Sequence, residues 1–487
     1  LEAVLLAAPE WKNRIRALHL DNLSHPAQLD HYLSTTAEQA RLIVVRLLGS
    51  RGHWSYGLEQ LQRWGDEHTD RQLLVLAGTV DQQRDLHGIG SVAPELADRL
   101  AALLREGGQT NMARLLEAIQ ALLDGTPPEI EQIEVVPLPD PFPWDWQDDV
   151  GATVGVVLYR AQLQAGDTAL AQQLNLALRK RGLRPRLIWV SSLRDPAVQA
   201  GVLDLLRSQG AQVVITGTAF ASVSSEQAGL GSPLWDRLDR PVLQLLTAGS
   251  SRERWQQSSR GLEPLDLSLQ VVMPELDARV TTRPCAFRQP RAPMGGLATA
   301  ITAQQPDQDG IDWLVEHAKG WIDLQDTPPS QRRMAMVLAN YPVRDGRLAN
   351  GEGLDTPASV VNLIDWLSEA GYQLGDLPRP DHGDQLIASL LQGRTNSAEG
   401  KQRRPVDHLP LATYQAWWDT IPIEARSLIA SRWGEPQHSY DLDEDHGFAI
   451  HGLRYGRLVV LLQPDRGYDP DQIADLHSPD LPPPHRY

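Results

Sequence analysis

Residues 333–370 read RMAMVLANYPVRDGRLANGEGLDTPASVVNLIDWLSEA and contain the pattern of one α/β repeat. The apolar start, residues 334–339, predicts a buried strand because it is short and carries no charge. A polar, glycine-rich loop follows over residues 341–355. Thr356-Pro357 then begins a helix, since threonine can cap a helix and proline suits its first turn. Open α/β sheets bind ligands in loops at the carboxyl ends of their strands, so we predict that this loop takes part in binding.

The same alternation of apolar strands and amphipathic helices extends outward from this segment over the rest of the chain. It predicts an α/β, multidomain protein built from successive doubly wound parallel-sheet units joined by proline-rich linkers. Strands are predicted at residues 41–48, 72–77, 154–159, 186–190, 212–216 and 242–246, and a strand pair at 447–451 and 457–463. Helices are predicted at residues 56–68, 94–105, 168–181, 196–209, 311–324 and 422–433.

The 487 residues exceed the length of one ordinary core, so we divide the chain. The division comprises an N-terminal α/β domain at 1–124, a proline- and tryptophan-rich linker at 125–150, a second α/β domain at 151–290, a linker and helix at 291–332, and a third α/β domain at 333–487. We expect the first linker to be an extended connector that its tryptophans staple to a neighbouring domain. We expect residues 289–310 to be polar and mobile and residues 393–404 to be disordered.

Composition excludes several classes of partner. The net charge is −17 with no dense basic cluster, which argues against a general nucleic-acid or acidic-membrane partner. No apolar run reaches the 18 or so residues of a membrane span. Cys285 is the only cysteine, so an internal disulfide is impossible and a reducing, cytoplasmic location is expected.

The motifs of the common nucleotide-binding and hydrolytic sites are absent from the sequence. None of the four lysines, Lys12, Lys180, Lys319 and Lys401, stands in the Gly-Lys-Ser/Thr context of a phosphate-binding loop. No GxGxxG follows the strand at 154–159, and no GxSxG indicates a serine hydrolase. If nucleotide hydrolysis drives this protein, we expect it to take place on another chain.

Several long segments, in order along the whole chain, resemble the large subunit of aerobic-type cobaltochelatases, the CobN/magnesium chelatase H-subunit family. They are VVRLLGSRGHWSYG at 44–57, YRAQLQAGDTA at 159–169, VLQLLTAGSSRERW at 242–255, ANYPVRDGRLANGEGLDTPAS at 339–359 and QPDRGYDPDQIADLHSPDLPPPH at 463–485. The motifs are more similar to the cobalt branch than to the magnesium branch.

The resemblance implies a tetrapyrrole-binding subunit that receives cobalt(II) as its substrate and inserts it into hydrogenobyrinic acid a,c-diamide in cobalamin biosynthesis. It further implies two smaller AAA+ type partner subunits that hydrolyse ATP with Mg²⁺ and drive insertion. The family's HxGxHGxxE motif, which supplies the main metal-site histidines and glutamate, is expected beyond Tyr487. Because the chain ends before that motif, the resemblance implies an incomplete, N-terminal and inactive portion of the family's large subunit. The missing initiator methionine leads us to expect that the sequence begins inside a longer gene product.

Two segments supply the candidate site residues. Removal of pyrrolic protons needs a carboxylate or imidazole, and we assign that role to Glu352 and His477. The substrate rim carries carboxylates and amides, which arginines and polar side chains can hold. The candidates for substrate binding are Arg344, Asp345, Arg347, Asn350, Asp355, Gln463, Arg466 and His485. A capping role for Asp355 at the start of the helix is an equal alternative.

Two other functions remain open from the residues. One is a magnesium chelatase H-like subunit that inserts Mg²⁺ into protoporphyrin IX. The other is a non-catalytic tetrapyrrole-binding module, since repeated α/β units can hold a ligand without reacting with it.

Overall fold

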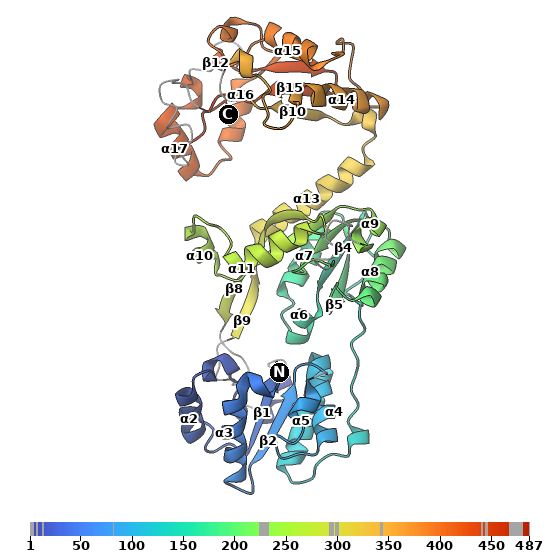
Figure 1. Cartoon of the computed structure of the whole chain (residues 1–487), viewed down its shortest axis with the longest axis vertical. Coiled ribbons are helices and arrows are strands. Elements are labelled where there is room, and N and C mark those ends of the chain that lie inside the picture. The colour runs from blue at the N-terminus through green and yellow to red at the C-terminus, as the bar shows by residue number, and fades with distance from the viewer. Residues whose placement is uncertain are drawn as a thin grey trace. The chain divides into compact units, whose positions relative to one another are not determined.

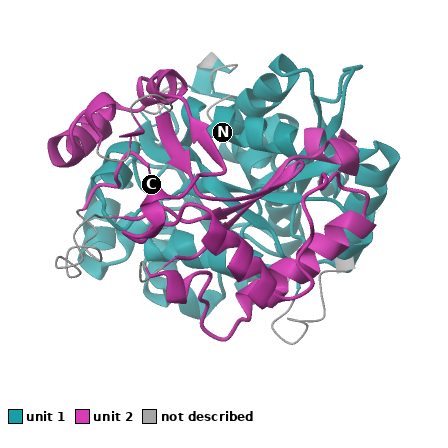
Figure 2. Ribbon diagram, turned by 90° about the horizontal axis from the view of Figure 1, so that it is seen from above, with its two compact units in different colours: residues 1–322 teal, residues 323–487 magenta. Residues whose placement is uncertain are grey.

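The chain divides into two compact units, Leu1–Ile322 and Asp323–Tyr487, which Figure 2 colours separately. The structure is a computed structural model, and it describes every residue except 1–3, 6–7, 12–13, 81, 224–232, 292–296, 298–300, 341–343, 440–441, 444–446, 467–480 and 487. Helices and strands alternate in both units, and both contain parallel strand pairs. The predicted α/β multidomain class is therefore confirmed.

Unit 1 contains two parallel-stranded sheets and the helices that cover them (Figure 1). The first sheet and its helices are α2 Pro26–Thr35, β1 Leu42–Leu47, α3 Ser55–Asp66, β2 Gln72–Ala77, α4 Pro94–Glu106 and α5 Gly108–Leu123. The second sheet has strands β3 Phe142–Trp144, β4 Thr153–Tyr159, β5 Arg184–Val190, β6 Ala211–Thr216, β7 Val242–Ala248, β8 Val280–Arg291 and β9 Ile301–Pro306. Its helices are α6 Arg160–Ala165, α7 Ala169–Lys180, α8 Pro196–Ser208, α9 Pro233–Leu238, α10 Arg252–Gln257, α11 Pro264–Leu267, α12 Met273–Glu275 and α13 Gln308–Asp326.

The second sheet is doubly wound, in the strand order β3-β5-β4-β6-β7-β8-β9. Strands β5, β4, β6, β7 and β8 are parallel, and neighbouring residues of β4 point to opposite faces. Val156 packs with α7 and α13, whereas Val157 packs with α8 and α9. Helices on both faces keep water from the central strands, so these strands read as continuous apolar runs.

Two segments predicted to lack regular structure form the edges of this sheet. β3 lies in the proline-rich linker and pairs antiparallel with β5, and β9 pairs antiparallel with β8. The expectation of a plain extended linker and the expectation of a mobile segment at 289–310 were both wrong here. The outer strands of a parallel sheet present unpaired N–H and C=O groups, and an extended segment can pair with them even when its own sequence is polar or rich in proline.

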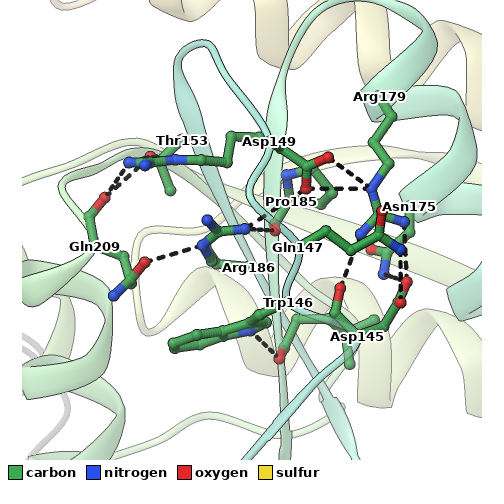
Figure 3. A network of polar contacts seen from close by, with 12 residues as sticks. Asp145, Trp146, Gln147, Asp149, Thr153, Asn175, Arg179, Pro185, Arg186 and Gln209 are labelled. Carbon is green, nitrogen blue, oxygen red and sulfur yellow. Dashed lines mark hydrogen bonds and ion pairs between the residues drawn. The ribbon is translucent and has the colours of Figure 1, made fainter.

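The end of the linker is fixed to β5 and α7 by Trp146 and by ion pairs (Figure 3). The indole N–H of Trp146 donates to the Leu187 carbonyl at 2.9 Å, and Arg179 pairs with Asp145 at 2.9 Å and with Asp149 at 3.2 Å. Burial disfavours ionisation of Asp145, but hydrogen bonds that include one from Arg179 outweigh burial and lower the pKa of this carboxyl. The predicted role of the linker tryptophans is confirmed.

Unit 2 contains two three-stranded sheets with the orders β10-β15-β14 and β11-β13-β12. Its strands are β10 Met334–Leu338, β11 Asp407–Leu409, β12 Leu442–Asp443, β13 Gly447–Ile450, β14 Gly452–Tyr455 and β15 Leu458–Leu462. Its helices are α14 Thr356–Glu369, α15 Gly383–Gln392, α16 Leu411–Trp418 and α17 Ile423–Trp433. The core of the first sheet consists of side chains from β15, α14 and α15, including Val460, Ile364 and Leu386.

The predicted pairing of residues 447–451 with 457–463 was wrong. β13 pairs with β11 and β12, whereas β15 pairs antiparallel with β14 and parallel with β10. The predicted division at residues 124, 150, 290 and 332 stays a prediction, although β3 and β9 extend the second sheet beyond residues 151–290. Among the described residues, no helix is long and apolar enough to cross a membrane.

A buried ion pair fastens the carboxyl end of β6 to the start of β8. Asp277 and Arg279 are almost completely buried and approach to 2.5 Å. Asp277 also accepts hydrogen bonds from the amide and hydroxyl of Ser222, at 2.8 and 2.9 Å. Arg279 donates to the Thr218 carbonyl and to Gln244, at 2.9 and 3.1 Å. Burial lowers the pKa of Arg279, so its charge depends on these partners.

We predict that Asp277→Ala lowers the free energy of unfolding of unit 1 by about 3–5 kcal/mol, because it leaves the Arg279 charge buried without its carboxylate. Urea denaturation followed by far-UV circular dichroism measures the change. The control is Glu316→Ala, which removes an exposed ion pair with Arg181 and should change stability by less than about 1 kcal/mol. Equal effects of the two substitutions would contradict the assigned role of the buried pair.

Candidate functional site

The candidate site begins where two parallel strands of unit 2 end side by side. β10 and β15 pair in register from Met334↔Leu458 to Leu338↔Leu462. The amide of Gln463 donates to the Leu338 carbonyl at 2.9 Å, directly beyond the last pair. The two predicted site segments, which are far apart in the sequence, therefore leave the same edge of one sheet, where α/β proteins place their ligands.

The loop after β10 is anchored by two buried apolar residues. Leu348 and Ala349 are buried, and the Ala349 amide donates to the Ala339 carbonyl at 3.0 Å. Ala349 has a φ of 60°, in the left-handed region that non-glycine residues seldom occupy. Backbone strain of this kind concentrates in functional loops, so it supports the functional interpretation of this one.

The same loop lines an open cavity of about 270 Å³ at the start of α14. The residues that line it are Gly346, Arg347, Leu348, Ala349, Asn350, Gly351, Leu354, Asp355 and Pro357. Complete small-molecule pockets measure about 300–1,000 Å³, so this cavity can hold a small polar group or one end of a larger ligand, but not a whole large ligand. A guanidinium and an amide on its wall suit a carboxylate or carboxamide.

Three of the predicted binding residues, Arg347, Asn350 and Asp355, line this cavity. Arg344 and Glu352 are exposed in the same loop but do not line it. Asp355 also caps α14, because its carboxylate accepts a hydrogen bond from the Ala358 amide at 3.0 Å. Binding and capping are compatible, since a carboxylate has two oxygens.

Asp345 is directed to a different partner. Its carboxylate accepts a hydrogen bond from the Thr395 hydroxyl at 2.8 Å and pairs with Arg403 at 3.5 Å. These contacts tie the loop to residues 393–404, so they give Asp345 a part in holding the loop in place.

The predicted residues near the end of the chain are more scattered. Gln463 lies directly after β15, and Arg466 is exposed three residues later. His477 lies outside the described residues. His485 is buried among Tyr414, Trp418 and Phe448, and both its ring nitrogens are engaged, with the Tyr414 hydroxyl at 2.9 Å and the Gly434 carbonyl at 2.8 Å. The binding role of each of these residues stays a prediction.

A buried polar cluster beside the Gln463 segment was not predicted, since no pattern in the sequence indicates it. In this cluster, the Asn396 side-chain oxygen lies 3.1 Å from Nδ1 of His451 and 2.9 Å from Nη2 of Arg486. Nε2 of His451 lies 3.1 Å from Nη1 of Arg486, which can only donate, so the imidazole carries its proton on Nδ1. Burial, and then the positive charge of Arg486, lower the pKa of His451 to about 3. The sequence around each of these residues resembles an ordinary polar loop. The cluster cannot be predicted from it, because the three partners come from distant segments.

Among the described residues, no group of three or more histidine, cysteine, aspartate or glutamate side chains could hold a metal ion. Neither Glu352 nor any of the described histidines therefore belongs to a ready-made metal centre within the part of the chain that the structure covers.

Because His451 is neutral in the folded protein, we predict that the stability of unit 2 depends on pH. Above pH 6.5 the histidine is neutral in the folded and unfolded states alike. As the pH falls from 6.5 towards 3, only the unfolded state gains the proton, so the stability of unit 2 should fall by about 1.4 kcal/mol per pH unit from this group. Arg486, Arg394, Lys401 and Asp443 are the charged groups that act on it.

Chemical denaturation of the wild type and His451→Gln at several pH values between 3.5 and 7.5 tests this prediction. The slope of stability against pH should be smaller in the variant by that amount, and carboxylates that titrate in both proteins cancel in the difference. Identical slopes would show that His451 does not titrate as proposed.

Comparison with known proteins identifies related chains. Residues 101–487 match the model of the CobN/Magnesium Chelatase family. The chain is 35% identical to the aerobic cobaltochelatase subunit CobN of Sinorhizobium sp., with 97% of this chain and 38% of that protein covered. It is 33% identical to the protein of the same name from Pseudomonas aeruginosa, with 99% of this chain and 39% of that protein covered.

A solved structure is similar as well. The catalytic subunit of cobaltochelatase from Mycobacterium tuberculosis superimposes with a TM-score of 0.70 and 27% identity, over 95% of this chain and 38% of that one. The chain thus spans about two fifths of the length of the relatives it matches.

Proposed function

Since this chain belongs to the CobN/magnesium chelatase family, we propose that it forms part of the tetrapyrrole-binding large subunit of a cobaltochelatase. The reaction is the insertion of Co²⁺, as substrate, into hydrogenobyrinic acid a,c-diamide. The observation that carries the proposal is the shared edge of β10 and β15, where two charged segments and a polar cavity come together. Both segments belong to the motifs on which the family resemblance rests.

Within this proposal, the loop after β10 holds the rim of the macrocycle. Arg347 and Asn350 on the cavity wall bind a rim carboxylate or carboxamide, with the exposed Arg344 of the same loop supporting them. A cavity of about 270 Å³ suits one such substituent. Gln463 and Arg466 approach the substrate from the neighbouring strand end.

Proton transfer is assigned to Glu352 and His477. Insertion of a divalent ion requires that two pyrrolic N–H protons leave the ring, and a carboxylate or neutral imidazole within hydrogen-bond reach can accept them. Glu352 is exposed at the tip of the loop, where it can meet a ring held by the cavity residues.

The energy for insertion comes from other chains in this proposal. No lysine of the sequence stands in a phosphate-binding loop, which supports ATP and Mg²⁺ binding on two smaller AAA+ type partner subunits. The magnesium branch of the family gives a second candidate, insertion of Mg²⁺ into protoporphyrin IX. The reconstituted complex, given cobalt with the corrinoid or magnesium with protoporphyrin, separates the two.

We predict that Arg347→Gln weakens binding of hydrogenobyrinic acid a,c-diamide about tenfold, because one charge-assisted hydrogen bond to the rim is lost. Titration of the chain with the corrinoid, followed by absorbance, measures the dissociation constant. Arg426→Gln removes an arginine that pairs with Asp419 in the same unit and should leave binding unchanged. Equal affinity of the wild type and Arg347→Gln would remove Arg347 from the site.

Glu352→Gln should leave corrinoid binding within about twofold of the wild type and lower the rate of cobalt insertion at least 100-fold, since the amide cannot accept a proton. The measurement uses a full-length large subunit with its two partner subunits and ATP. Unchanged binding together with unchanged insertion would eliminate Glu352 as the base. A corrinoid that binds to the wild-type complex without any insertion would favour a non-catalytic binding module.

A further inference from the structure

The segment at residues 393–404, expected to be disordered, folds into a compact turn with buried polar side chains, so that expectation was wrong. Thr395 is fully buried and Asn396 is 3% exposed. The Ser397 hydroxyl accepts the Gly400 amide at 3.0 Å, and the Arg394 amide donates to the Arg404 carbonyl at 3.0 Å. Hydrogen bonds across the turn and to distant segments, which composition does not reveal, offset the entropy of ordering it.

The turn requires glycine at position 400. A Cβ atom built on Gly400 would lie 1.8 Å from Oγ1 of Thr395 and 2.9 Å from the Ser397 hydroxyl. The backbone therefore approaches the two hydroxyls closely. The Gly400 backbone therefore limits the directions in which the Thr395 hydroxyl can point.

Thr395 contacts the first candidate loop. Its hydroxyl lies 2.8 Å from one carboxylate oxygen of Asp345, while Arg403 of the same turn reaches the other oxygen at 3.5 Å. Asp345 begins the short helical turn that leads to the cavity residues Arg347 and Asn350. The position of Thr395 thus fixes the start of that wall.

Asn396 contacts the second candidate segment. Its side-chain N–H donates to the Gln463 carbonyl at 2.8 Å, while its oxygen accepts from His451 and Arg486. One side chain must both donate and accept here, which an asparagine can do and an ionised aspartate cannot. The adjacent residues Thr395 and Asn396 therefore hold the starts of the two segments.

We propose that Thr395 and Asn396 are positioning residues, which set the separation of the two substrate segments at the ends of β10 and β15. The inference rests on the proposed function and adds to it residues outside the segments that were predicted to bind. Neither side chain needs to touch the substrate. A displacement of about 1 Å in the groups that hold a substrate can lower activity about 100-fold, so a fixed separation has a functional value beyond stability.

The test compares two substitutions of Thr395 that differ in one group. Thr395→Val keeps the shape and removes the hydroxyl, whereas Thr395→Ser keeps the hydroxyl. We expect Thr395→Val to weaken corrinoid binding about tenfold and Thr395→Ser to bind within about twofold of the wild type, because only valine removes the partly buried hydrogen bond to the Asp345 carboxylate. Thr420→Val, which removes an exposed hydroxyl bonded to the Trp417 carbonyl, is the matched control.

Hydrogen exchange of the same proteins without ligand supplies a second readout. In Thr395→Val, the amide of Ala349 should exchange faster, while amides in the middle of α14 keep their protection. This local change separates a positioning role from general destabilisation, in which all the amides of unit 2 would lose protection together.

Three outcomes would contradict these proposals, and they distinguish the positioning role from the proposed function. If Thr395→Val binds the corrinoid as tightly as the wild type, the positioning role is wrong, but the proposed function still stands. Weak binding by Thr395→Ser, in parallel with a uniform loss of protection, also overturns it, because the loss then follows stability and not the hydroxyl. A wild-type chain that leaves the absorbance of the corrinoid unchanged overturns the proposed function itself.

Discussion

The parallel pairing of β10 with β15 is the constraint on which the candidate site depends. Its five paired positions join strands at opposite ends of unit 2, and the chain between them forms α14, α15, a second sheet and two further helices. Closing so long a loop has an entropy cost that only burial can offset, and side chains such as Leu338, Ile364 and Val460 provide it. Once the strands are paired, their carboxyl ends cannot separate, and the segments that follow must begin side by side.

Buried polar groups then fix what the strands bring together. In unit 1, Asp277 and Arg279 hold the carboxyl end of β6, and in unit 2, Asn396 links Gln463, His451 and Arg486. A buried polar group without a partner is unfavourable, so such clusters tolerate few alternative arrangements. Apolar packing alone would allow the loops more freedom.

The proposed chemistry combines exposed functional side chains with a loop backbone that buried contacts hold in place. Arg347 and Asn350 lie on a cavity wall that Asp345, Thr395 and the buried Ala349 keep in place. Arg347, Asn350 and Glu352 are all exposed in this loop, where a large, flat substrate can reach them. An arrangement that binds one substituent firmly and leaves the rest of a ring accessible suits a reaction in which a metal ion must still enter.

The sequence by itself determined the place and limits of the most strongly patterned helices and strands, such as β2 at Gln72–Ala77 and α4 at Pro94–Glu106, because apolar periodicity records the local backbone, but it missed α5, α15 and β8. It also located the loop that holds Arg347 and Asn350. Only the tertiary structure decided that β15 pairs with β10, that residues 142–144 and 301–306 become edge strands, that Thr395 and Asn396 are buried, and that His485 has both ring nitrogens engaged. The physical reason is that each of these depends on hydrogen-bond partners far away in the chain, which no local pattern specifies.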